Sequence, residues 1–261
     1  MHCPGVTGAV CLVTGAAQGI GEAVARCLAH HGAQVALVDS KEERVNWVAS
    51  EIRADGGRAI AECADVRDAQ AIANVIERVE REIRGIDTLV NAAGILRPGP
   101  VATYDDADFA DTFAVNVLGV FLVSRAVANR MVPRRSGSIV TIGSNSDTVS
   151  RIHMSAYAAS KAAAATFTKC LGLELAQYGI RCNVVSPGST DTPMQRSLWT
   201  EGRGRAEVIS GSLEDFRVGI PLRKLARPED VANAVLFLVS DQAGHVTMQN
   251  LYVDGGAGLG A

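Results

Sequence analysis

A glycine-rich turn, Thr14-Gly15-Ala16-Ala17-Gln18-Gly19-Ile20-Gly21, lies between an apolar run at residues 9–13 and a helical pattern at 20–31. This is the strand–turn–helix context of a dinucleotide-binding loop. Glycines permit a tight turn and close approach of the backbone, and a helix N-terminus favours the charge of a pyrophosphate. The spacing differs from GxGxxG, so the alternative that this glycine turn binds no ligand stays open. The loop predicts dinucleotide contacts from Gly15, Gln18, Gly19, Ile20 and Gly21.

Outward from this turn, apolar runs alternate with helical patterns along the chain. The expected strands lie at 9–13, 34–38, 58–63, 88–90, 138–142, 181–185 and 250–253, and the expected helices at 20–31, 41–54, 68–84, 108–131, 157–177 and 228–239. Apolar strands that alternate with helices form a parallel sheet covered on both faces. We expect an α/β fold: a Rossmann-like, doubly wound parallel sheet of about seven strands in a single domain, residues 1–261. The polar segment 190–219 interrupts the pattern and is expected to be a lid-like insertion.

Composition excludes several classes of protein. The chain has 261 residues, of which 48% are hydrophobic, and a net charge of −3, which argues against nucleic-acid or membrane-surface binding. No signal peptide is recognised, and no apolar stretch reaches the ~18 residues that span a bilayer. The six cysteines form no CxxC pair and lie mostly in apolar segments, so we expect reduced core thiols rather than disulfides or metal ligands. These features predict a cytoplasmic protein without a metal.

Two acidic positions bear on the choice of dinucleotide. Asp39 ends the second apolar run, where a carboxylate accepts hydrogen bonds from ribose hydroxyls and repels a 2′-phosphate. No Arg or Lys lies within the glycine loop, so NAD is predicted over NADP. Asp65 and Val66 follow the third run and are candidates for the adenine edge. For both aspartates, capping of the next helix is the open alternative.

A second motif, Tyr157 and Lys161, is spaced so that both side chains fall on one helix face. An ammonium beside a phenol favours the phenolate, so we expect Lys161 to lower the tyrosine pKa towards neutrality and create a usable base. Ser144 follows the apolar run 138–142, where its hydroxyl can reach the same substrate oxygen. By itself, the Tyr–Lys pair is more often an amphipathic surface pair.

Taken together, the motifs resemble those of the short-chain dehydrogenase/reductase family over essentially the whole chain. They are TGAAQGIG, Asn91-Ala92-Ala93-Gly94, Asn116, Ser144, Tyr157 with Lys161, and Pro187-Gly188. The resemblance implies that Ser144 orients the substrate oxygen, Tyr157 transfers its proton, and Lys161 binds the nicotinamide ribose. It also implies that Asn116 supports a water for proton exit, although a core Asn bonded to backbone is the alternative. Residues placed beside the cofactor are Asn91, Ala92, Gly94, Tyr157, Lys161, Pro187, Gly188, Thr190 and Thr192.

Several loops resemble one subfamily, the 2,3-dihydro-2,3-dihydroxybenzoate dehydrogenases of catechol siderophore synthesis. These loops are residues 91–97, 151–157, 181–192, 194–199 and 253–256. The resemblance implies oxidation of a ring hydroxyl of a cyclohexadiene carboxylate to an aromatic product. The chain departs from the pattern at 144–150 and at His153. Alternatives are therefore a 2,3-dihydro-3-hydroxyanthranilate substrate, another cyclic alcohol or ketone, or a catalytically idle NAD-binding relative.

An anionic ring acid needs a fixed cation, and the planar guanidinium suits a carboxylate. Arg97 and Arg151 lie in loops that other motifs place at the site, and Arg196 lies in the expected lid. Met154 and Met194 belong to the matching loops and are assigned to the substrate. The resemblance also implies a homotetramer, for which Ala158, Ala159, Ala162, Ala163, Ala165 and Thr166 offer a small-residue helix face.

Overall fold

The computed structural model describes residues 3–200 and 204–260, and its centre is one parallel sheet. Seven strands lie in the order β3-β2-β1-β4-β5-β6-β7, and every neighbouring pair is parallel. They are β1 (Val10–Thr14), β2 (Gln34–Asp39), β3 (Arg58–Cys63), β4 (Thr88–Asn91), β5 (Gly137–Ile142), β6 (Ile180–Pro187) and β7 (Asn250–Val253). The chain reverses its direction of strand addition between β1 and β4, which is where ligands bind in open sheets of this kind.

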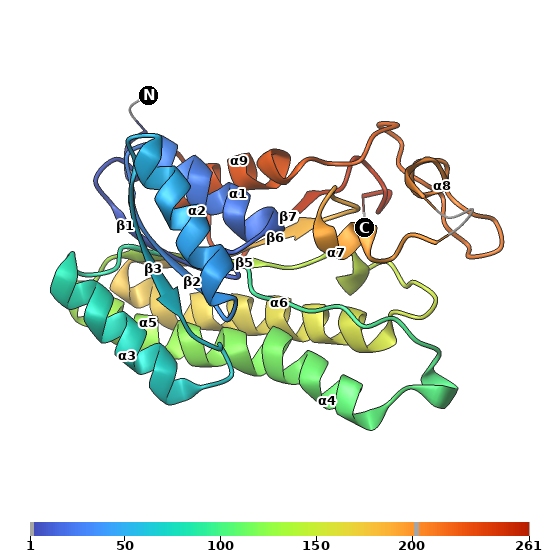
Figure 1. Cartoon of the computed structure of the whole chain (residues 1–261), viewed down its shortest axis with the longest axis horizontal. Helices are drawn as coiled ribbons and strands as arrows, with labels where there is room; N and C mark the ends of the chain where they lie inside the picture. Colours follow the sequence, from blue (N-terminus) through green and yellow to red (C-terminus); the bar gives the residue numbers. More distant parts are fainter. Residues whose placement is uncertain (1–2, 201–203, 261) are drawn as a thin grey trace.

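Helices cover both faces of the sheet (Figure 1). One layer contains α1 (Gly19–His30), α2 (Glu42–Ala54) and α9 (Pro228–Val239), with α1 against α9. The other contains α3 (Ala69–Glu82), α4 (Asp106–Phe113), α5 (Val120–Arg134) and α6 (Ser155–Leu175). Each layer encloses its own apolar core against the sheet. The predicted α/β fold with about seven parallel strands is confirmed.

The strands are apolar because both faces are covered. All five residues of β1 are buried, as are all four of β4. Such strands show no alternation of polar and apolar residues, and their length and flanking turns identify them. The expected bounds agree with the structure to within a few residues, except that β6 continues to Pro187. That extension brings the end of β6 to the ligand edge of the sheet.

The expected single helix at 108–131 is interrupted. A π-helical turn, η2 (Ala114–Gly119), separates α4 from α5. π turns inside α-helices are frequently found at functional sites. The apolar pattern of this segment does not reveal the extra residue, because one widened turn barely changes the hydrophobic period.

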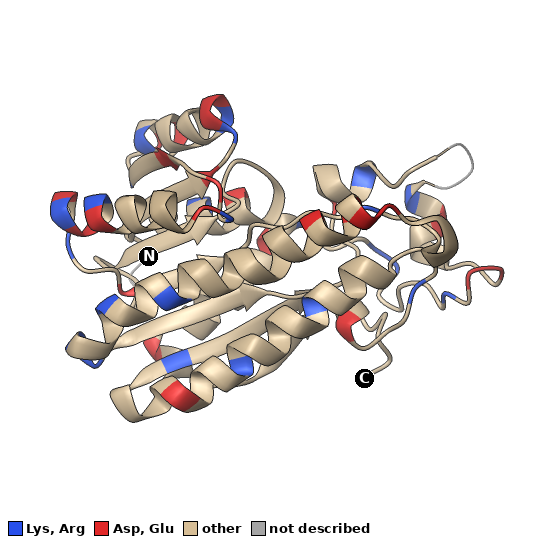
Figure 2. Cartoon of the chain, turned by 90° about the horizontal axis from the view of Figure 1, so that it is seen from below, with Lys and Arg blue, Asp and Glu red and all other residues tan. Residues whose placement is uncertain are grey.

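The helical run Asp106–Arg134 corrects the expectation that no stretch could span a bilayer, since by length and composition it is sufficient. Its residues Val123, Val127 and Met131 are buried in the core beneath the sheet, as in the core helix of a globular protein. The long helices that face the viewer in Figure 2 carry few charged residues along their lengths. Some apolar residues of these helices therefore pack against the sheet, and others lie on the outer face of the helix layer.

The segment 190–219 contains two short helices, α7 (Pro193–Arg196) and α8 (Arg205–Ser210). Thr190 bridges to Ala226, and Ser212 pairs with Arg217 in an antiparallel bridge. Leu213 and Phe216, at the tip of this bridged turn, are 95% and 89% exposed. The segment lies at one end of the sheet, and its role as a lid stays a prediction.

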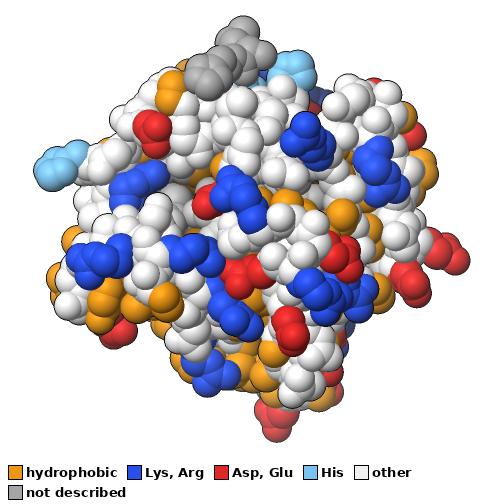
Figure 3. Space-filling model, turned by 90° about the vertical axis from the view of Figure 1, so that its left-hand side faces the viewer, with side chains coloured by type: hydrophobic (Ala, Val, Ile, Leu, Met, Phe, Trp, Pro, Cys, Tyr) orange, Lys and Arg blue, Asp and Glu red, His pale blue; other side chains and the backbone are white. Residues whose placement is uncertain are grey.

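The surface charges and the thiols can be compared with what the composition predicts. On the face of the molecule drawn in Figure 3, basic and acidic side chains are interspersed, without a continuous basic field. All six cysteines are free. Cys63 and Cys170 are exposed, contrary to the expectation of core thiols, because each sits on the solvent side of its strand or helix.

Candidate active site

A cleft of about 500 Å³ opens at the carboxyl ends of the strands. It collects predicted residues from many segments of the chain. They are Gly15, Gln18, Gly19, Ile20, Gly21, Asp39, Asp65, Val66, Ala92, Gly94, Arg97, Ser144, Arg151, Met154, Tyr157, Lys161, Pro187, Gly188, Thr190, Thr192 and Met194. Three predicted residues, Asn91, Asn116 and Arg196, are not among its lining.

The glycine loop is packed so closely that side chains are excluded. Gly15 has φ of +66°, and a Cβ there would lie 2.6 Å from the backbone nitrogen of Ala93. A Cβ on Gly21 would lie 2.1 Å from the Gly15 carbonyl oxygen. Thr14 Oγ1 accepts hydrogen bonds from the backbone of Ala92 and Ala93, at 3.1 and 3.2 Å. The ends of β1 and β4 thus form a bare backbone cradle at the start of α1.

The two acidic candidates at the cofactor end differ in their partners. Asp39 accepts hydrogen bonds from the backbone nitrogens of Ala17 and Lys41, at 3.1 and 3.0 Å. Lys41 rather than Asp39 is the N-cap of α2, and Asp68 caps α3, so neither predicted aspartate is the helix cap. The Arg67 guanidinium hydrogen-bonds Asp65 and holds the pKa of that carboxyl below its usual range.

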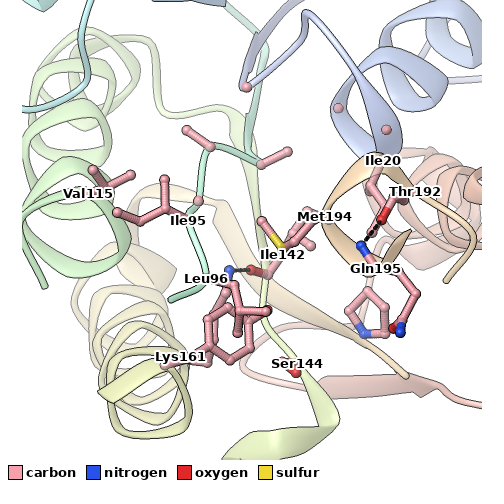
Figure 4. A pocket seen from close by; sticks show the side chains of 18 of the residues that line it. Ile20, Ile95, Leu96, Val115, Ile142, Ser144, Lys161, Thr192, Met194 and Gln195 are labelled. Atoms are coloured by element: carbon pink, nitrogen blue, oxygen red, sulfur yellow. Dashed lines mark hydrogen bonds between the residues drawn. The ribbon is translucent and has the colours of Figure 1, made fainter. Parts of the chain in front are cut away.

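Ser144, Tyr157 and Lys161 converge from β5 and α6. All three side chains are buried, with 9% or less of each residue exposed. The Lys161 ammonium donates to the Ile142 carbonyl at 2.8 Å and lies 5.7 Å from the centroid of the Tyr157 ring. Figure 4 shows Ser144, Lys161, Leu96 and Met194 around the same space. The sequence spacing therefore placed the three side chains correctly.

Burial controls the protonation of this group. It raises the pKa of Tyr157 to about 12, and the hydrogen bond from Ser144 only partly opposes that rise. Burial lowers the pKa of Lys161 to about 8. The expectation that Lys161 alone would bring the phenol towards neutrality is wrong for this state. The ammonium is directed at the Ile142 carbonyl, and desolvation of the phenolate outweighs its attraction.

Asn116 lies within the π turn and fastens it to the loop after β4. Its amide donates to the Ile95 carbonyl at 3.0 Å and to Ser160 Oγ at 2.9 Å, and its oxygen accepts from the Ile95 nitrogen at 2.9 Å. Both amide hydrogens are therefore used within the protein. These bonds match the alternative stated above, in which Asn116 is a core residue bonded to the backbone. The role in holding a water remains a prediction.

Asn91 was predicted beside the cofactor, but its side chain does not line the cleft. It is buried and donates to Ser124 Oγ at 2.9 Å and to Thr141 Oγ1 at 3.4 Å. On a strand, successive side chains point to opposite faces, and Asn91 points towards α5. It is therefore a residue of the layer between sheet and helix, and its neighbour Ala92 reaches the cleft.

The three candidate arginines have different environments. Arg97 is 46% exposed and paired with Asp111 at 2.6 Å and Asp108 at 3.2 Å. Arg196 pairs with Asp191 at 2.7 Å outside the cleft lining, which corrects its assignment to the substrate. Arg151 is half-buried in the cleft, with a weak 3.4 Å contact from its guanidinium to Asn145 Oδ1. Burial, and secondarily the charge of Arg217, lowers the pKa of Arg151.

The cleft also contains residues that sequence reasoning missed. Arg217, Leu198 and Gln195 reach it from the segment after β6, and Lys41, Arg67 and Asp111 reach it from the cofactor side. Gln195 and Leu198 belong to the matching loop 194–199, but no motif marks Arg217, because the path of a loop brings it to the cleft. Ser146 also lines the cleft, and its spacing of two from Ser144 was a signal that could have been used.

The comparisons with known proteins agree with this geometry. Residues 15–258 match the family model described as enoyl-(acyl carrier protein) reductase, a short-chain dehydrogenase/reductase model. A structure titled 7α-hydroxysteroid dehydrogenase, complexed with NADH and 7-oxo glycochenodeoxycholic acid, superposes with a TM-score of 0.89. It is 33% identical, covering 97% of this chain and 95% of that one.

Two curated relatives carry the same name. The 2,3-dihydro-2,3-dihydroxybenzoate dehydrogenase of Bacillus subtilis (strain 168) is 59% identical over 260 residues, covering 100% of both chains. The protein of that name from Escherichia coli (strain K12) is 45% identical over 249 residues, covering 95% of this chain and 96% of the other. The matched regions thus extend over the segments of the substrate end as well as over the glycine loop.

Proposed function

Because this chain belongs to the short-chain dehydrogenase/reductase family, we propose that it oxidises 2,3-dihydro-2,3-dihydroxybenzoate to 2,3-dihydroxybenzoate with NAD. The observation that carries the proposal is the buried Ser144–Tyr157–Lys161 group beside the glycine cradle, in a chain 59% identical to a dehydrogenase of that name. The chain is a nicotinamide-dependent oxidoreductase. The substrate and the choice of NAD are the finer steps that we propose here.

The residues at the cofactor end fit a dinucleotide. Gly15 and Gly21 leave backbone where a Cβ would clash, and the N-terminus of α1 faces the cradle. A Cβ on Gly94 would come within 3.4 Å of the Lys161 ammonium, so this glycine keeps space beside the lysine. When bound, oxidised NAD supplies the acceptor for the substrate hydride and a positively charged ring. Ala92, Gly94, Pro187 and Gly188 would border it.

Asp39 supports NAD rather than NADP. Its carboxylate lies at the cleft and is held by two backbone donors, so a 2′-phosphate would meet a fixed negative charge. Lys41 also lines the cleft, but its ammonium donates to Gln18 Oε1 at 3.1 Å. The lysine would have to leave that contact to neutralise a phosphate.

Ser144 and Tyr157 share the chemistry at the substrate oxygen. Ser144 donates a hydrogen bond to that oxygen, and Tyr157 takes its proton as the carbon–hydrogen bond breaks and the ketone forms. Enolisation of the ketone then gives the aromatic ring. Lys161 and the positive charge of the cofactor both favour the phenolate and offset the burial that raises the pKa of Tyr157. The pair therefore becomes a base only in the complete complex.

Arg151 is the residue that we propose for the ring carboxylate. It is half-buried in the cleft, six residues before Tyr157, and its 3.4 Å contact to Asn145 Oδ1 is weak. Arg97 lines the rim, but two carboxylates already bind its guanidinium. A charged group that is partly desolvated gains more from a bidentate anion than an exposed ion pair does. Met154 and Met194 would border the ring.

The decisive assay offers the purified protein 2,3-dihydro-2,3-dihydroxybenzoate and 2,3-dihydro-3-hydroxyanthranilate side by side with NAD. Appearance of NADH absorbance with the dihydroxy acid, at a higher kcat/KM than with the amino acid, is expected. A preference for the amino acid would contradict the substrate and keep the reaction class. No turnover of either acid, with NADH bound normally, would support the idle relative instead.

We also propose a cytoplasmic homotetramer. In α6, Ala159 and Thr166 are exposed and Ala158, Ala162 and Ala163 half-buried, so another helix can approach closely; Ala165 is buried inside. Phe109 and Leu118, on the neighbouring α4 and η2, are 47% and 45% exposed. An apolar outer face of this kind is typical of a surface covered by a second copy. Light scattering at micromolar concentration should give the mass of four chains, and a monomeric mass would contradict it.

A further inference from the structure

Ser146 lies directly behind the hydroxyl of Ser144. It belongs to η3 (Asn145–Asp147), the short turn that follows β5, and is 4% exposed. Its hydroxyl donates to Ser144 Oγ at 2.8 Å, and its backbone nitrogen donates to the same oxygen at 3.2 Å. Two donors of one residue therefore converge on one hydroxyl of the reacting group.

This arrangement fixes what Ser144 can do. A serine hydroxyl has one hydrogen to donate and two lone pairs with which to accept. Ser146 occupies both lone pairs, so the hydrogen of Ser144 is the one group that it has left to offer. Ser144 can donate to an oxygen in the cleft but cannot accept the proton of a substrate hydroxyl.

From this geometry we infer that Ser146 is a positioning residue that makes Ser144 a donor only. The inference rests on the proposed alcohol oxidation at Ser144 and Tyr157. With Ser144 unable to accept, the substrate O–H has Tyr157 as its acceptor, and Ser144 donates to the oxygen that becomes the carbonyl. A hydroxyl that already accepts hydrogen bonds is also polarised into a stronger donor. Ser146 therefore keeps two roles at the substrate oxygen apart: Ser144 donates a hydrogen bond to it, and Tyr157 accepts its proton.

The hydroxyl of Ser146 is not needed to hold the turn. The backbone nitrogen of Ser146 already bonds Ser144, and the Asp147 nitrogen closes the turn on the Ser144 carbonyl at 3.1 Å. Asp147 accepts from Asn250 at 2.9 Å and from the Tyr252 hydroxyl at 3.1 Å, which ties the turn to β7. Removing one hydroxyl should leave this frame in place.

A double-mutant cycle separates positioning from general damage. Ser146→Ala should lower kcat by roughly 3- to 10-fold, the range for one neutral hydrogen bond. In a Ser144→Ala background the same change should alter kcat by less than about twofold. Equal losses in both backgrounds would overturn the inference. Ser150→Ala, an exposed serine of the same loop, is the matched control and should leave kcat unchanged.

Two further readouts exclude a merely structural effect. Ser146→Ala should shift the rising limb of the kcat–pH profile to higher pH, because Ser144 becomes a weaker donor to the substrate oxygen, which then holds its proton more tightly. Ser146→Thr should restore the profile. A crystal structure of Ser146→Ala should show the Ser144 hydroxyl in more than one rotamer. If the wild type oxidised neither acid, the proposed function would fail, yet this structure would still test Ser146. A single unchanged rotamer would contradict its role.

Discussion

The cofactor end and the substrate end of the cleft are built in different ways. At the cofactor end, Gly15 and Gly21 are required because backbone occupies the space of a side chain, and Asp39 is held by backbone nitrogens. At the substrate end, Arg151 and Arg217 approach from loops that are 66 positions apart (217 − 151). Backbone geometry restricts residue type, whereas a side-chain site can be assembled from many sequences. The first end therefore sets a cofactor class, and the second sets a substrate.

The largest expected effect lies where the two ends meet. Tyr157→Phe should reduce turnover by ~100- to 10,000-fold, the usual contribution of a positioned acid or base. The affinity for NADH, measured by fluorescence titration, should stay within about twofold, since the phenol is not part of the backbone cradle. Turnover within a few-fold of the wild type would mean that Tyr157 is not the proton acceptor.

The next largest effect concerns recognition of the carboxylate of the ring acid. Arg151→Ala should lower kcat/KM for the ring acid by roughly 10- to 150-fold, because a hydrogen bond to a charged group is worth ~1.5–3 kcal/mol. A neutral cyclic alcohol without the carboxylate should lose little. Arg97→Ala should have a smaller effect, since Asp108 and Asp111 already engage it.

Arg196→Ala is the matched control for these arginines, because its guanidinium pairs with Asp191 outside the cleft lining. If Arg97→Ala discriminated acid from alcohol more strongly than Arg151→Ala did, the carboxylate would bind at the rim. If neither variant discriminated, the recognition of an anion by these arginines would be disproved.

The pH dependence tests the electrostatics of the shared centre. Oxidation uses the phenolate, and burial raises the pKa of Tyr157 while Lys161 and the cofactor oppose that rise, so the rate should rise with pH up to the pKa reached in the complex. Well below that pKa, the phenolate fraction grows about tenfold per pH unit. The slope should decrease above pH 8, because Lys161, with a pKa of about 8, then loses the charge that favours the phenolate. A flat kcat profile from pH ~6 to ~9 in single-turnover experiments would contradict the role of Tyr157.

The smallest effect concerns the cofactor end alone. Asp39→Ala should narrow the preference for NAD over NADP by roughly tenfold, because the variant lacks the charge that opposes a 2′-phosphate. The ratio of kcat/KM for the two cofactors measures it. Lys41→Ala is the companion variant and should widen the preference if the lysine reaches the phosphate. Equal wild-type use of both cofactors would refute the assignment from Asp39.

The sequence predicted the backbone-built parts of the molecule well. The glycine turn, the parallel sheet implied by strand–helix alternation, and the Tyr157–Lys161 face all follow from local spacing. The misplaced residues are those whose environment depends on distant segments. Asn91 points towards Ser124, Arg196 pairs with Asp191, and Lys161 donates to the Ile142 carbonyl. Arg217 had no local signal, since only the path of the loop brings it to the cleft.

The π turn Ala114–Gly119 makes the length of this helical run as important as its composition. Each residue turns an α-helix by about 100°. Deleting one residue here would restore a regular helix but rotate Asp108 and Asp111, the partners of Arg97, relative to α5. Homologues should therefore vary very little in residue number along 106–134.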